Sequence, residues 1–186
     1  YPFGAAFLYD FCAAVPSLDN DVLWESLIGI GIPSEVVDAL KYFYHDNYRL
    51  LRIKADIFNS VGVHAGVRQG CPLSPVLFVL CIESLLCALE AAIPNIDTIG
   101  AFADDIGLVS RNVVADLPHI TSIFELFGAF SGIRLSIPKT VLIPLCDDPI
   151  ITIIRAQEWL LTNGWPDINI AYKAKYLGFI IGLRAQ

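Results

Sequence analysis

Two adjacent acidic residues interrupt an apolar run at residues 101–109, which reads A-F-A-D-D-I-G-L-V. A buried carboxylate is costly unless it is hydrogen-bonded, paired with a charge or bound to a metal ion. The apolar segments on either side, residues 99–103 and 106–109, are typical of two short strands joined by a turn at Asp104 and Asp105. Any fold of this chain must therefore place two carboxylates at the tip of a largely buried hairpin and give them partners.

The rest of the pattern mixes strands and helices without regular alternation. Apolar runs and alternating stretches predict strands at residues 3–9, 48–55, 61–65, 141–144 and 176–181. Helical periodicity predicts helices at residues 22–28, 74–92, 117–130 and 149–161, and another that starts within residues 32–35 and continues to residue 44. No repeat, low-complexity tract or charge run divides the chain. We therefore expect one domain over residues 1–186, of the α+β class.

Three places carry helix start signals. The segment S-L-D-N-D at residues 17–21 offers capping side chains for the first helix. Ser74 is expected to cap the long apolar helix, with Pro75 at its first position. Asp147 and Asp148 precede a further helix, and we interpret them as capping residues rather than as a second acidic site.

The cysteines predict neither a disulfide framework nor a zinc site. Their number is odd, no C-x-x-C pair is present and no histidine lies at ligand spacing. The five are Cys12, Cys71, Cys81, Cys87 and Cys146. Free thiols of this kind predict a reducing, intracellular setting, in which cysteines act as small buried hydrophobes.

The hydrophobic content, 55% of the residues, raises the question of a membrane. The longest uncharged stretch, residues 69–82, contains two prolines, a glycine and a glutamine, so we expect no spanning helix. The first apolar segment lacks a basic lead-in and meets Asp10 at once, which argues against a signal peptide. The chain has no Met, and both ends adjoin apolar runs, so we expect it to be a piece of a longer protein.

A third acid is expected to join the pair. Asp10 ends the first apolar strand, which is the required position if that strand lies beside the hairpin. Adjacent acids at a hairpin tip point to opposite faces, so one of Asp104 and Asp105 faces a shared centre and the other lies beside it. Carboxylates that converge at about 4 Å repel each other unless cations lie between them. Oxygen ligands without His or Cys favour Mg²⁺ or Mn²⁺, and two such ions form the clamp for phosphoryl transfer.

A simpler interpretation stands beside this one. Asp104 and Asp105 only form the hairpin turn, where Asp is a common residue.

Five blocks of sequence, one of which contains the acidic pair, carry recognisable motifs. They are F-L-Y-D-F-C-A-A at residues 7–14, R-Q-G-C-P-L-S-P-V-L-F at 68–78, A-F-A-D-D at 101–105, S-G-I-R-L-S-I-P-K-T at 131–140 and Y-L-G-F-I-I-G at 176–182. In this order they resemble the first acidic motif, the central motif, the aromatic-x-Asp-Asp motif, the Lys motif and the primer-gripping hairpin of reverse transcriptases. The resemblance is to the enzymes of non-LTR retrotransposons and, more distantly, of group II introns.

The resemblance implies a polymerase palm with part of the fingers and without the thumb. The implied activity is that of an RNA-directed DNA polymerase, which adds dNTPs to a primer 3′-hydroxyl during retrotransposition. Asp10 and Asp104 would be the principal ligands of two Mg²⁺ or Mn²⁺ ions, with Asp105 in support and the backbone carbonyl of Phe11 as a further ligand. The residues implied for nucleotide and template binding are Phe11, Val15, Arg68, Gln69, Gly70 and Phe102. A glycine at position 70 would let a base pair approach the backbone closely.

Three of the matched positions have two interpretations each. Arg68 contacts template phosphate, or is a solvated charge after a strand. Lys139 is a general acid for the departure of pyrophosphate, or an exposed Lys beside a proline. Val15 stands where this family carries a bulky aromatic that blocks a 2′-hydroxyl. The smaller side chain implies weaker rejection of ribonucleotides, or it marks a decaying copy of an element.

The charge balance suggests that these residues need further parts of a parent protein. There are 12 basic residues against 19 acidic ones, a net charge of −7, whereas phosphate binding requires Lys and Arg. The implied partners are an RNA template, a DNA primer and a dNTP, together with the missing fingers, thumb and endonuclease regions of the parent. No membrane partner is expected, and the resemblance implies that the protein acts in the nucleus. We expect the 186 residues alone to be inactive.

Two other functions are weighed against this one. A catalytically inactive relic would keep the palm fold as a scaffold for protein or nucleic-acid contacts. Another palm-type nucleotidyl transferase, such as a nucleotide cyclase, would use similar metals but should not need the block at Gln69 and Gly70.

Overall fold

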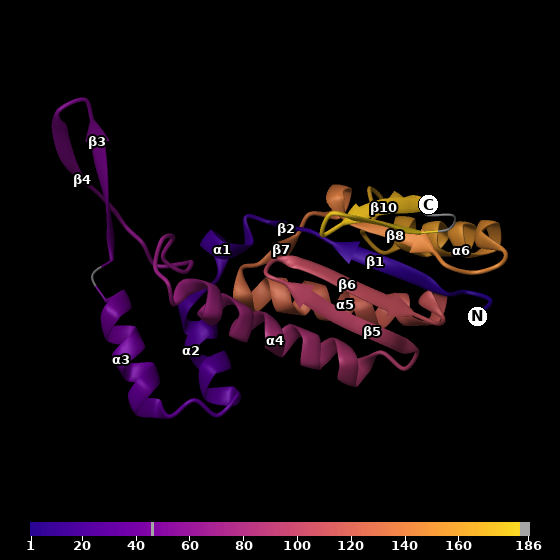
Figure 1. Cartoon of the computed structure of the whole chain (residues 1–186), viewed down its shortest axis with the longest axis horizontal. Helices are drawn as coiled ribbons and strands as arrows, with labels where there is room; N and C mark the ends of the chain where they lie inside the picture. Colours follow the sequence, from indigo (N-terminus) through magenta and orange to yellow (C-terminus); the bar gives the residue numbers. More distant parts are fainter. Residues whose placement is uncertain (46, 183–186) are drawn as a thin grey trace.

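A five-stranded sheet forms the centre of the molecule in the computed structural model, which describes residues 1–45 and 47–182 (Figure 1). The strand order is β5-β6-β1-β8-β9, and all neighbours are antiparallel except β8 and β9. The strands are β1 (Ala5–Tyr9), β5 (Ile96–Phe102), β6 (Asp105–Ser110), β8 (Val141–Pro144) and β9 (Asn169–Ile170). The first strand of the chain therefore lies in the middle of the sheet, with the acidic hairpin β5-β6 on one side of it.

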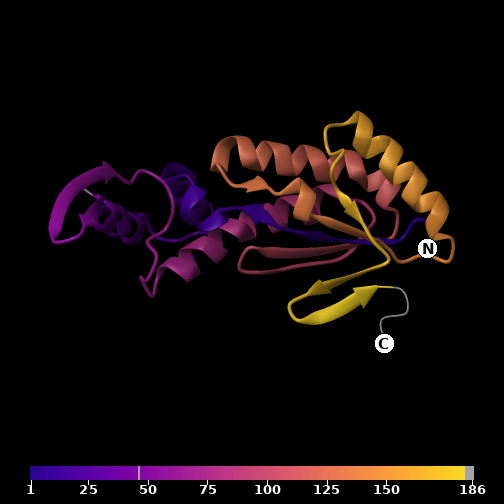
Figure 2. The same cartoon turned by 90° about the horizontal axis from the view of Figure 1, so that it is seen from above.

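The two faces of the sheet are covered by different elements. Phe7 and Tyr9 of β1 point to one face and belong to the main core, together with residues of α4 (Ser74–Ala92), α5 (Val113–Ser131) and α6 (Pro149–Thr162). Ala6 and Leu8 point to the other face. There they form a smaller cluster with residues of the hairpin β10 (Lys173–Tyr176) and β11 (Phe179–Gly182). Figure 2 shows this hairpin on the side of the sheet opposite to α5 and α6.

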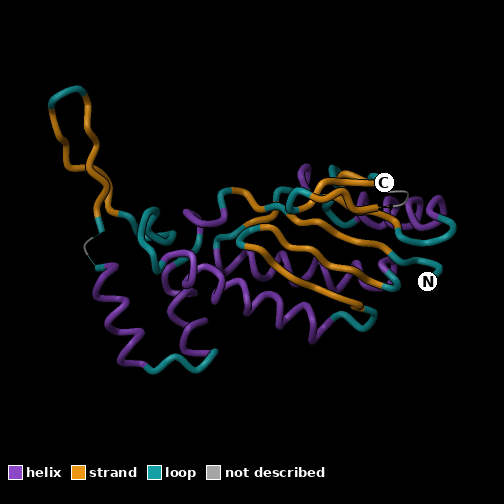
Figure 3. The backbone as a smooth tube through the Cα atoms, in the orientation of Figure 1, coloured by secondary structure: helices purple, strands orange, loops and turns teal. Residues whose placement is uncertain are grey.

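The remaining elements extend one end of the sheet. They are β2 (Phe11–Cys12), α1 (Ala14–Ser17), α2 (Asn20–Gly29), α3 (Ser34–Tyr44), β3 (Tyr48–Ile53), β4 (Asp56–Gly62), β7 (Arg134–Leu135) and the 3₁₀ turn η1 (Ile137–Lys139). The hairpin β3-β4 projects away from the body, as Figure 3 shows most clearly. Helices α2 and α4 pack together, so this end shares the main core. The mixture of an antiparallel-dominated sheet with helices on one face confirms the α+β prediction.

Several predicted boundaries agree with the structure, and others differ from it. The helix at residues 74–92 and the strand at 141–144 are found as predicted. A single strand at residues 176–181 is wrong, because Leu177 and Gly178 adopt positive φ angles of 47° and 90° and form a turn between β10 and β11. The partner strand begins at Asp56 instead of residue 61. The acidic hairpin turns at Ala103 (φ 55°), so Asp105 is the first residue of β6.

The capping predictions have mixed outcomes. The Asp19 carboxylate accepts hydrogen bonds from the N–H groups of Asp21 (2.8 Å) and Val22 (3.2 Å), which confirms the cap of α2. Ser74 is not the cap of α4; that position is taken by Leu73, and Ser74 lies inside the first turn. Asp148 is the N-terminal flanking residue of α6, but its side chain makes no capping hydrogen bond.

Helices α4 and α5 are long and apolar enough to cross a membrane by length and composition alone. In the fold they pack against each other, and α4 also packs on β5. Each contributes a row of buried side chains to the main core. Such helices are typical of the interior of a mixed domain. Their packing agrees with the expectation drawn from the interrupted apolar stretch.

Asp116 holds the end of the sheet to the start of α5. Its carboxylate is fully buried and accepts hydrogen bonds from the Ser110 hydroxyl (2.6 Å) and the Asn95 side-chain amide (2.8 Å). Removal of this acceptor would leave buried donors without a partner.

We predict that Asp116→Ala lowers the free energy of unfolding by about 2–4 kcal/mol, measured by urea denaturation followed by circular dichroism. Asp167→Ala is the matched control, because Asp167 is exposed, and it should change stability by less than about 0.5 kcal/mol. Equal stabilities of the two variants would contradict this assignment.

Candidate active site

The pairing of β1 with β6 brings acidic residues together at one end of the sheet. Tyr9 lies opposite Ile106, so the next residues along, Asp10 and Asp105, come to opposite positions at the strand ends. Ile106 points to the helical face, and Asp105 therefore points to the face covered by the β10-β11 hairpin. Asp10 has the same parity as Leu8 and shares that face. Asp104 lies beside them in the turn.

The electrostatics of this end are those of crowded like charges. The pKa of the Asp105 carboxyl is raised, mainly by partial burial and further by the negative charges of Asp104 and Asp10. Among the residues that the structure describes, no three His, Cys, Asp or Glu side chains converge closely enough to hold a metal ion by themselves. The carboxylates are near neighbours without forming a closed cage. A cation between them would relieve their repulsion.

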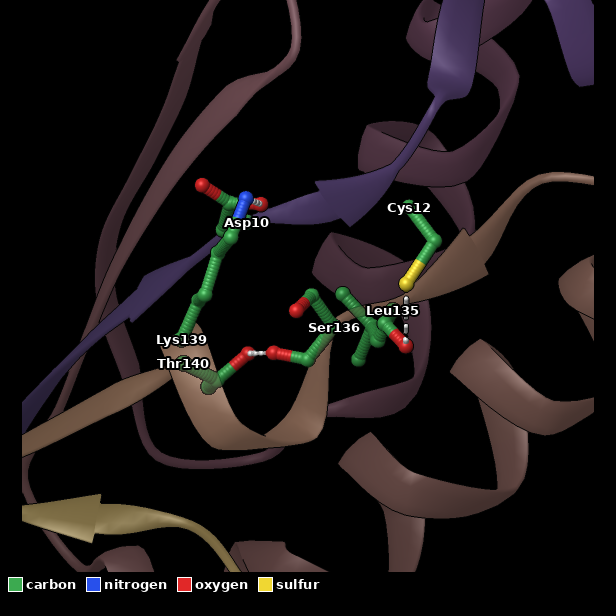
Figure 4. A network of polar contacts seen from close by, with 6 residues as sticks. All are labelled: Asp10, Cys12, Leu135, Ser136, Lys139 and Thr140. Carbon is green, nitrogen blue, oxygen red and sulfur yellow. Dashed lines mark hydrogen bonds and ion pairs between the residues drawn. The ribbon is translucent and has the colours of Figure 1, made fainter.

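Lys139 supplies a positive charge to this site. Its Nζ lies 3.4 Å from Oδ1 of Asp10, and the two side chains point toward one another in Figure 4. The backbone N–H of Ser136 donates to the Asp10 carbonyl (2.8 Å), and the buried Thr140 hydroxyl donates to the Ser136 carbonyl (3.1 Å). These bonds attach the η1 turn to the end of β1 and so position Lys139. Both charged groups are partly exposed, so solvent weakens the ion pair.

Tyr176 connects the β10-β11 hairpin to the acidic tip. Its hydroxyl donates to the backbone carbonyl of Asp105 at 3.2 Å. A Cβ atom at Gly107 would lie 3.3 Å from that hydroxyl, so the absence of a side chain lets the ring come close to β6. Burial and the charge of Asp105 raise the pKa of the Tyr176 phenol. The sequence block placed this residue in a hairpin but gave no signal for the contact, because the acceptor is a backbone atom distant in the chain.

A pocket of about 450 Å³ lies next to the acidic turn. It contains four of the residues implied for nucleotide and template binding, namely Val15, Arg68, Gln69 and Gly70. Ala103, which precedes Asp104, completes the wall on the side of the turn. The other lining residues are Val67, Cys71, Pro72, Ser74, Pro75, Phe78 and Val79. The volume and the mostly apolar lining are those of a small-molecule site.

Arg68 and Gly70 have defined conformations in this pocket. The Arg68 guanidinium lies 5.3 Å from the centre of the Tyr44 ring, and its backbone N–H donates to the Tyr44 hydroxyl at 3.4 Å. Arg68 is therefore held in place and is not a freely solvated charge. Gly70 has a φ angle of +86°, which other residues rarely adopt, while a Cβ there would meet open space. In the free protein, glycine is therefore favoured at position 70 by the backbone conformation and not by a lack of space for a side chain.

Phe11 and Phe102 lie outside the pocket. The Phe11 side chain is buried in the core against Phe124, so only its backbone is available to a ligand. Phe102 is 67% exposed at the end of β5. It lines a different cavity of about 440 Å³, which lies between the sheet and the hairpin that carries Tyr176. The structure thus separates these two residues from Val15, Gln69 and Gly70.

Comparison with known proteins agrees with the motifs. A family model described as reverse transcriptase (RNA-dependent DNA polymerase) matches residues 9–181. The Pol polyprotein of the type-1 retrotransposable element R2 of Popillia japonica is 32% identical over 185 residues, which cover 94% of this chain and 26% of that protein. The Transposon TX1 149 kDa protein of Xenopus laevis is 30% identical over 135 residues, covering 68% of this chain and 10% of that protein. The chain therefore spans from a tenth to about a quarter of these curated relatives.

The fold is similar to that of solved telomerases. The apo telomerase of Candida Tropicalis superimposes with a TM-score of 0.70 at 13% identity, over 98% of this chain and 31% of that chain. A version of the same telomerase truncated from its C-terminal domain gives a TM-score of 0.69 at 14% identity, over 98% of this chain and 34% of that chain. This likeness confirms the predicted polymerase palm.

We predict that Asp105→Asn raises the free energy of unfolding of the metal-free protein at pH 7. Because the folded-state pKa of Asp105 is raised, the folded protein binds this proton more tightly than the unfolded chain does and loses stability as pH rises through that pKa. Asn cannot ionise and avoids the loss. The gain should stay below about 1 kcal/mol, because the carboxyl is partly exposed and its repulsions are screened.

The gain should fade as the pH falls to about 3.9, the ordinary pKa of Asp, because below that pH the carboxyl is mostly protonated in both the folded and the unfolded state. Urea denaturation at pH 7 and at pH 4 measures it, with Asp167→Asn as the control at an exposed position. If Asp105→Asn is no more stable than wild type at pH 7, then burial and the neighbouring carboxylates do not destabilise the ionised Asp105 side chain.

Proposed function

Because the chain belongs to the reverse transcriptase (RNA-dependent DNA polymerase) family, we propose that it carries the catalytic centre of an RNA-directed DNA polymerase. The proposed reaction adds dNTPs to the 3′-hydroxyl of a DNA primer along an RNA template during retrotransposition. The observation that carries the proposal is the meeting of Asp10 and Asp105 beside Asp104. The pocket lined by Gln69, Gly70 and Ala103, next to the acidic turn, supports the proposal that the incoming nucleotide binds there.

Divalent ions fit this site by donor chemistry. Mg²⁺ usually takes one or two carboxylates and completes its octahedron with water and substrate phosphates, so a closed protein cage is not required. Asp10 and Asp104 are the proposed principal ligands, Asp105 the supporting one, and the carbonyl of Phe11 a further donor. Two bound Mg²⁺ or Mn²⁺ ions would stabilise negative charge on the attacking and leaving oxygens.

The chain's own residues would orient the reactants around that centre. Gln69 and the left-handed turn at Gly70 form the pocket wall against which a nucleotide and its template base would rest. Arg68, held against Tyr44, would meet template phosphate. Lys139 would donate its proton to the departing pyrophosphate once its ion pair with Asp10 has opened. Roles for Phe11 and Phe102 in nucleotide or template binding stay predictions, since neither side chain lines this pocket.

The parent protein would supply what these residues lack. With 12 basic against 19 acidic residues, the chain is a poor binder of polyanions by itself. We infer that fingers, thumb and endonuclease regions of a longer protein hold the RNA template and the DNA primer, and that the reaction takes place in the nucleus. The 186 residues alone would then extend a primer negligibly.

We predict that the chain binds Mn²⁺ and that Asp104→Asn weakens this binding about tenfold or more, because a ligand carboxylate loses its charge. Isothermal titration calorimetry of the 186-residue protein measures both affinities. Asp167→Asn, at an exposed position outside the acidic motifs, should bind as wild type does. Equal binding by wild type and Asp104→Asn would favour an inactive relic that keeps the fold.

The same variant tests the reaction in a longer protein that includes the flanking parts of the parent. Primer extension on an RNA template should be abolished by Asp104→Asn and retained by Asp167→Asn. Extension by the longer protein that survives Asp104→Asn would overturn the assignment. Processive extension by the 186 residues alone would refute the inferred need for the other regions.

Val15 generates a separate prediction about sugar discrimination. Val15 lines the pocket and leaves room where an aromatic side chain would stand. In the longer protein, Val15→Phe should lower the incorporation of ribonucleotides relative to deoxyribonucleotides by about tenfold or more, because the ring fills the space of a 2′-hydroxyl. Competition between rNTP and dNTP in primer extension measures the ratio, and Val15→Ile is the aliphatic control. An unchanged ratio in Val15→Phe would place the sugar elsewhere.

A further inference from the structure

Cys71 lines the pocket that holds Gln69 and Gly70, just before the start of α4. Its backbone is fixed by two hydrogen bonds, from its own N–H to the Arg68 carbonyl (3.3 Å) and from the Ser74 N–H to its carbonyl (3.1 Å). The residue is partly exposed, so a small solute in the pocket can reach the sulfur.

The surroundings of this sulfur favour the thiolate. The first N–H groups of a helix have no acceptor within the helix, and α4 is 19 residues long. The pKa of the Cys71 thiol is lowered, first by the backbone N–H of Leu73 and further by the charge of Arg68, while partial burial opposes them. Arg68 is the charged residue among those that line the pocket. A helix start and a nearby cation are the usual causes of an acidic, reactive cysteine.

Ser74 provides an independent sign that the pocket is built to receive a polar group. Its side chain is 4% exposed and lines the pocket. Its hydroxyl oxygen has no hydrogen-bond partner among the described residues. The Nε atom of Arg68 is also buried without a partner there. A buried donor of this kind normally has a partner, and a thiolate at Cys71 or a polar adduct on it would provide one.

We propose that Cys71 is a modification site that undergoes thiol–disulfide exchange with a low-molecular-weight disulfide. The thiolate attacks one sulfur of RS–SR, the new bond between Cys71 and that sulfur forms as the old S–S bond breaks, and RS⁻ leaves and takes up a proton. One disulfide is consumed and one is formed, so no further oxidant is needed. A thiol reductant reverses the step.

The consequence for activity rests on the proposed function. An adduct on Cys71 would project into the same pocket of about 450 Å³ that Val15 and Gln69 line. A group the size of a tripeptide would fill it and exclude a nucleotide. The modified protein would then be switched off until the mixed disulfide is reduced.

The other cysteines serve as controls within the same molecule. Cys12 and Cys87 are exposed, whereas Cys81 and Cys146 are buried. Cys12 donates weakly to the Leu135 carbonyl, and Cys87 lies along α4 near Glu83, away from the helix start. Burial raises the pKa of Cys81, which further suppresses its reaction.

The test is the rate of reaction of each cysteine in the 186-residue protein with glutathione disulfide, resolved by peptide mass spectrometry. At pH 7 we expect Cys71 to react about threefold or more faster than Cys12 and Cys87, and the advantage to shrink near pH 9.5, where ordinary thiols also ionise. Ser74→Ala should slow Cys71 and leave Cys87 unchanged. A Cys71 rate at pH 7 no greater than that of Cys87 would overturn the proposal.

A second measurement separates this proposal from the proposed function. In the longer protein, glutathione disulfide should inhibit primer extension, dithiothreitol should restore it, and Cys71→Ser should show the same rate with and without the disulfide, whatever that rate is. Fast modification of Cys71 without inhibition would retain the modification site and refute its control of the nucleotide pocket. Absence of extension before any treatment would count against the proposed function, while the rates on the shorter protein would still decide the reactivity of Cys71.

Discussion

The antiparallel pairing of β1 with β6 is the constraint on which the site depends. Tyr9 lies opposite Ile106 in this register. Asp10, which follows Tyr9, and Asp105, which precedes Ile106, therefore come to opposite positions. A shift by one residue would turn Phe7 and Tyr9 out of the core and Asp10 toward the helices. The apolar face of a single central strand therefore sets the position of a charged group at its end. Packing free energy in the core is what holds like charges near one another.

A second arrangement places the pocket beside the acids. The loop before α4 must carry Arg68, Gln69 and Gly70 past the acidic turn before the helix can bury its apolar side, and a left-handed glycine makes this path possible. The same loop brings Cys71 to the start of the helix, where the first N–H groups have no acceptor within the helix itself. A pocket wall and an acidic thiol thus arise from one local geometry, and substitutions in this loop would affect both.

The elements that could be predicted from the sequence are those whose signals lie within a short stretch of the chain. The long apolar stretch with a proline near its start predicted the bounds of α4. The acidic ends of two apolar runs indicated that Asp10 would lie near the pair Asp104 and Asp105, but not which of the two lies opposite it; the register of β1 and β6 identifies Asp105. The turn between β10 and β11 was not predicted, because Leu177 adopts a positive φ angle, which is unusual for leucine and has no signal in the sequence. The cap at Ser74 was wrong because Ser74 is already the first residue of α4, and Leu73 occupies the position before it. Contacts to backbone atoms of distant segments, such as that of Tyr176 with Asp105, leave no trace in composition or spacing.

The close approach of Tyr176 to Gly107 should couple the residue types that evolution accepts at these two positions. A Cβ atom at position 107 would lie 3.3 Å from the Tyr176 hydroxyl, so the phenol would have to shift to make room for it. A smaller residue at position 176 would instead leave a void above Gly107 in the cluster that docks the hairpin. Lineages that keep one should keep the other, and a change at either site should be followed by a compensating change at its neighbour. Covariation of positions 107 and 176 among related sequences would be the evolutionary consequence of the contact between the Tyr176 hydroxyl and β6.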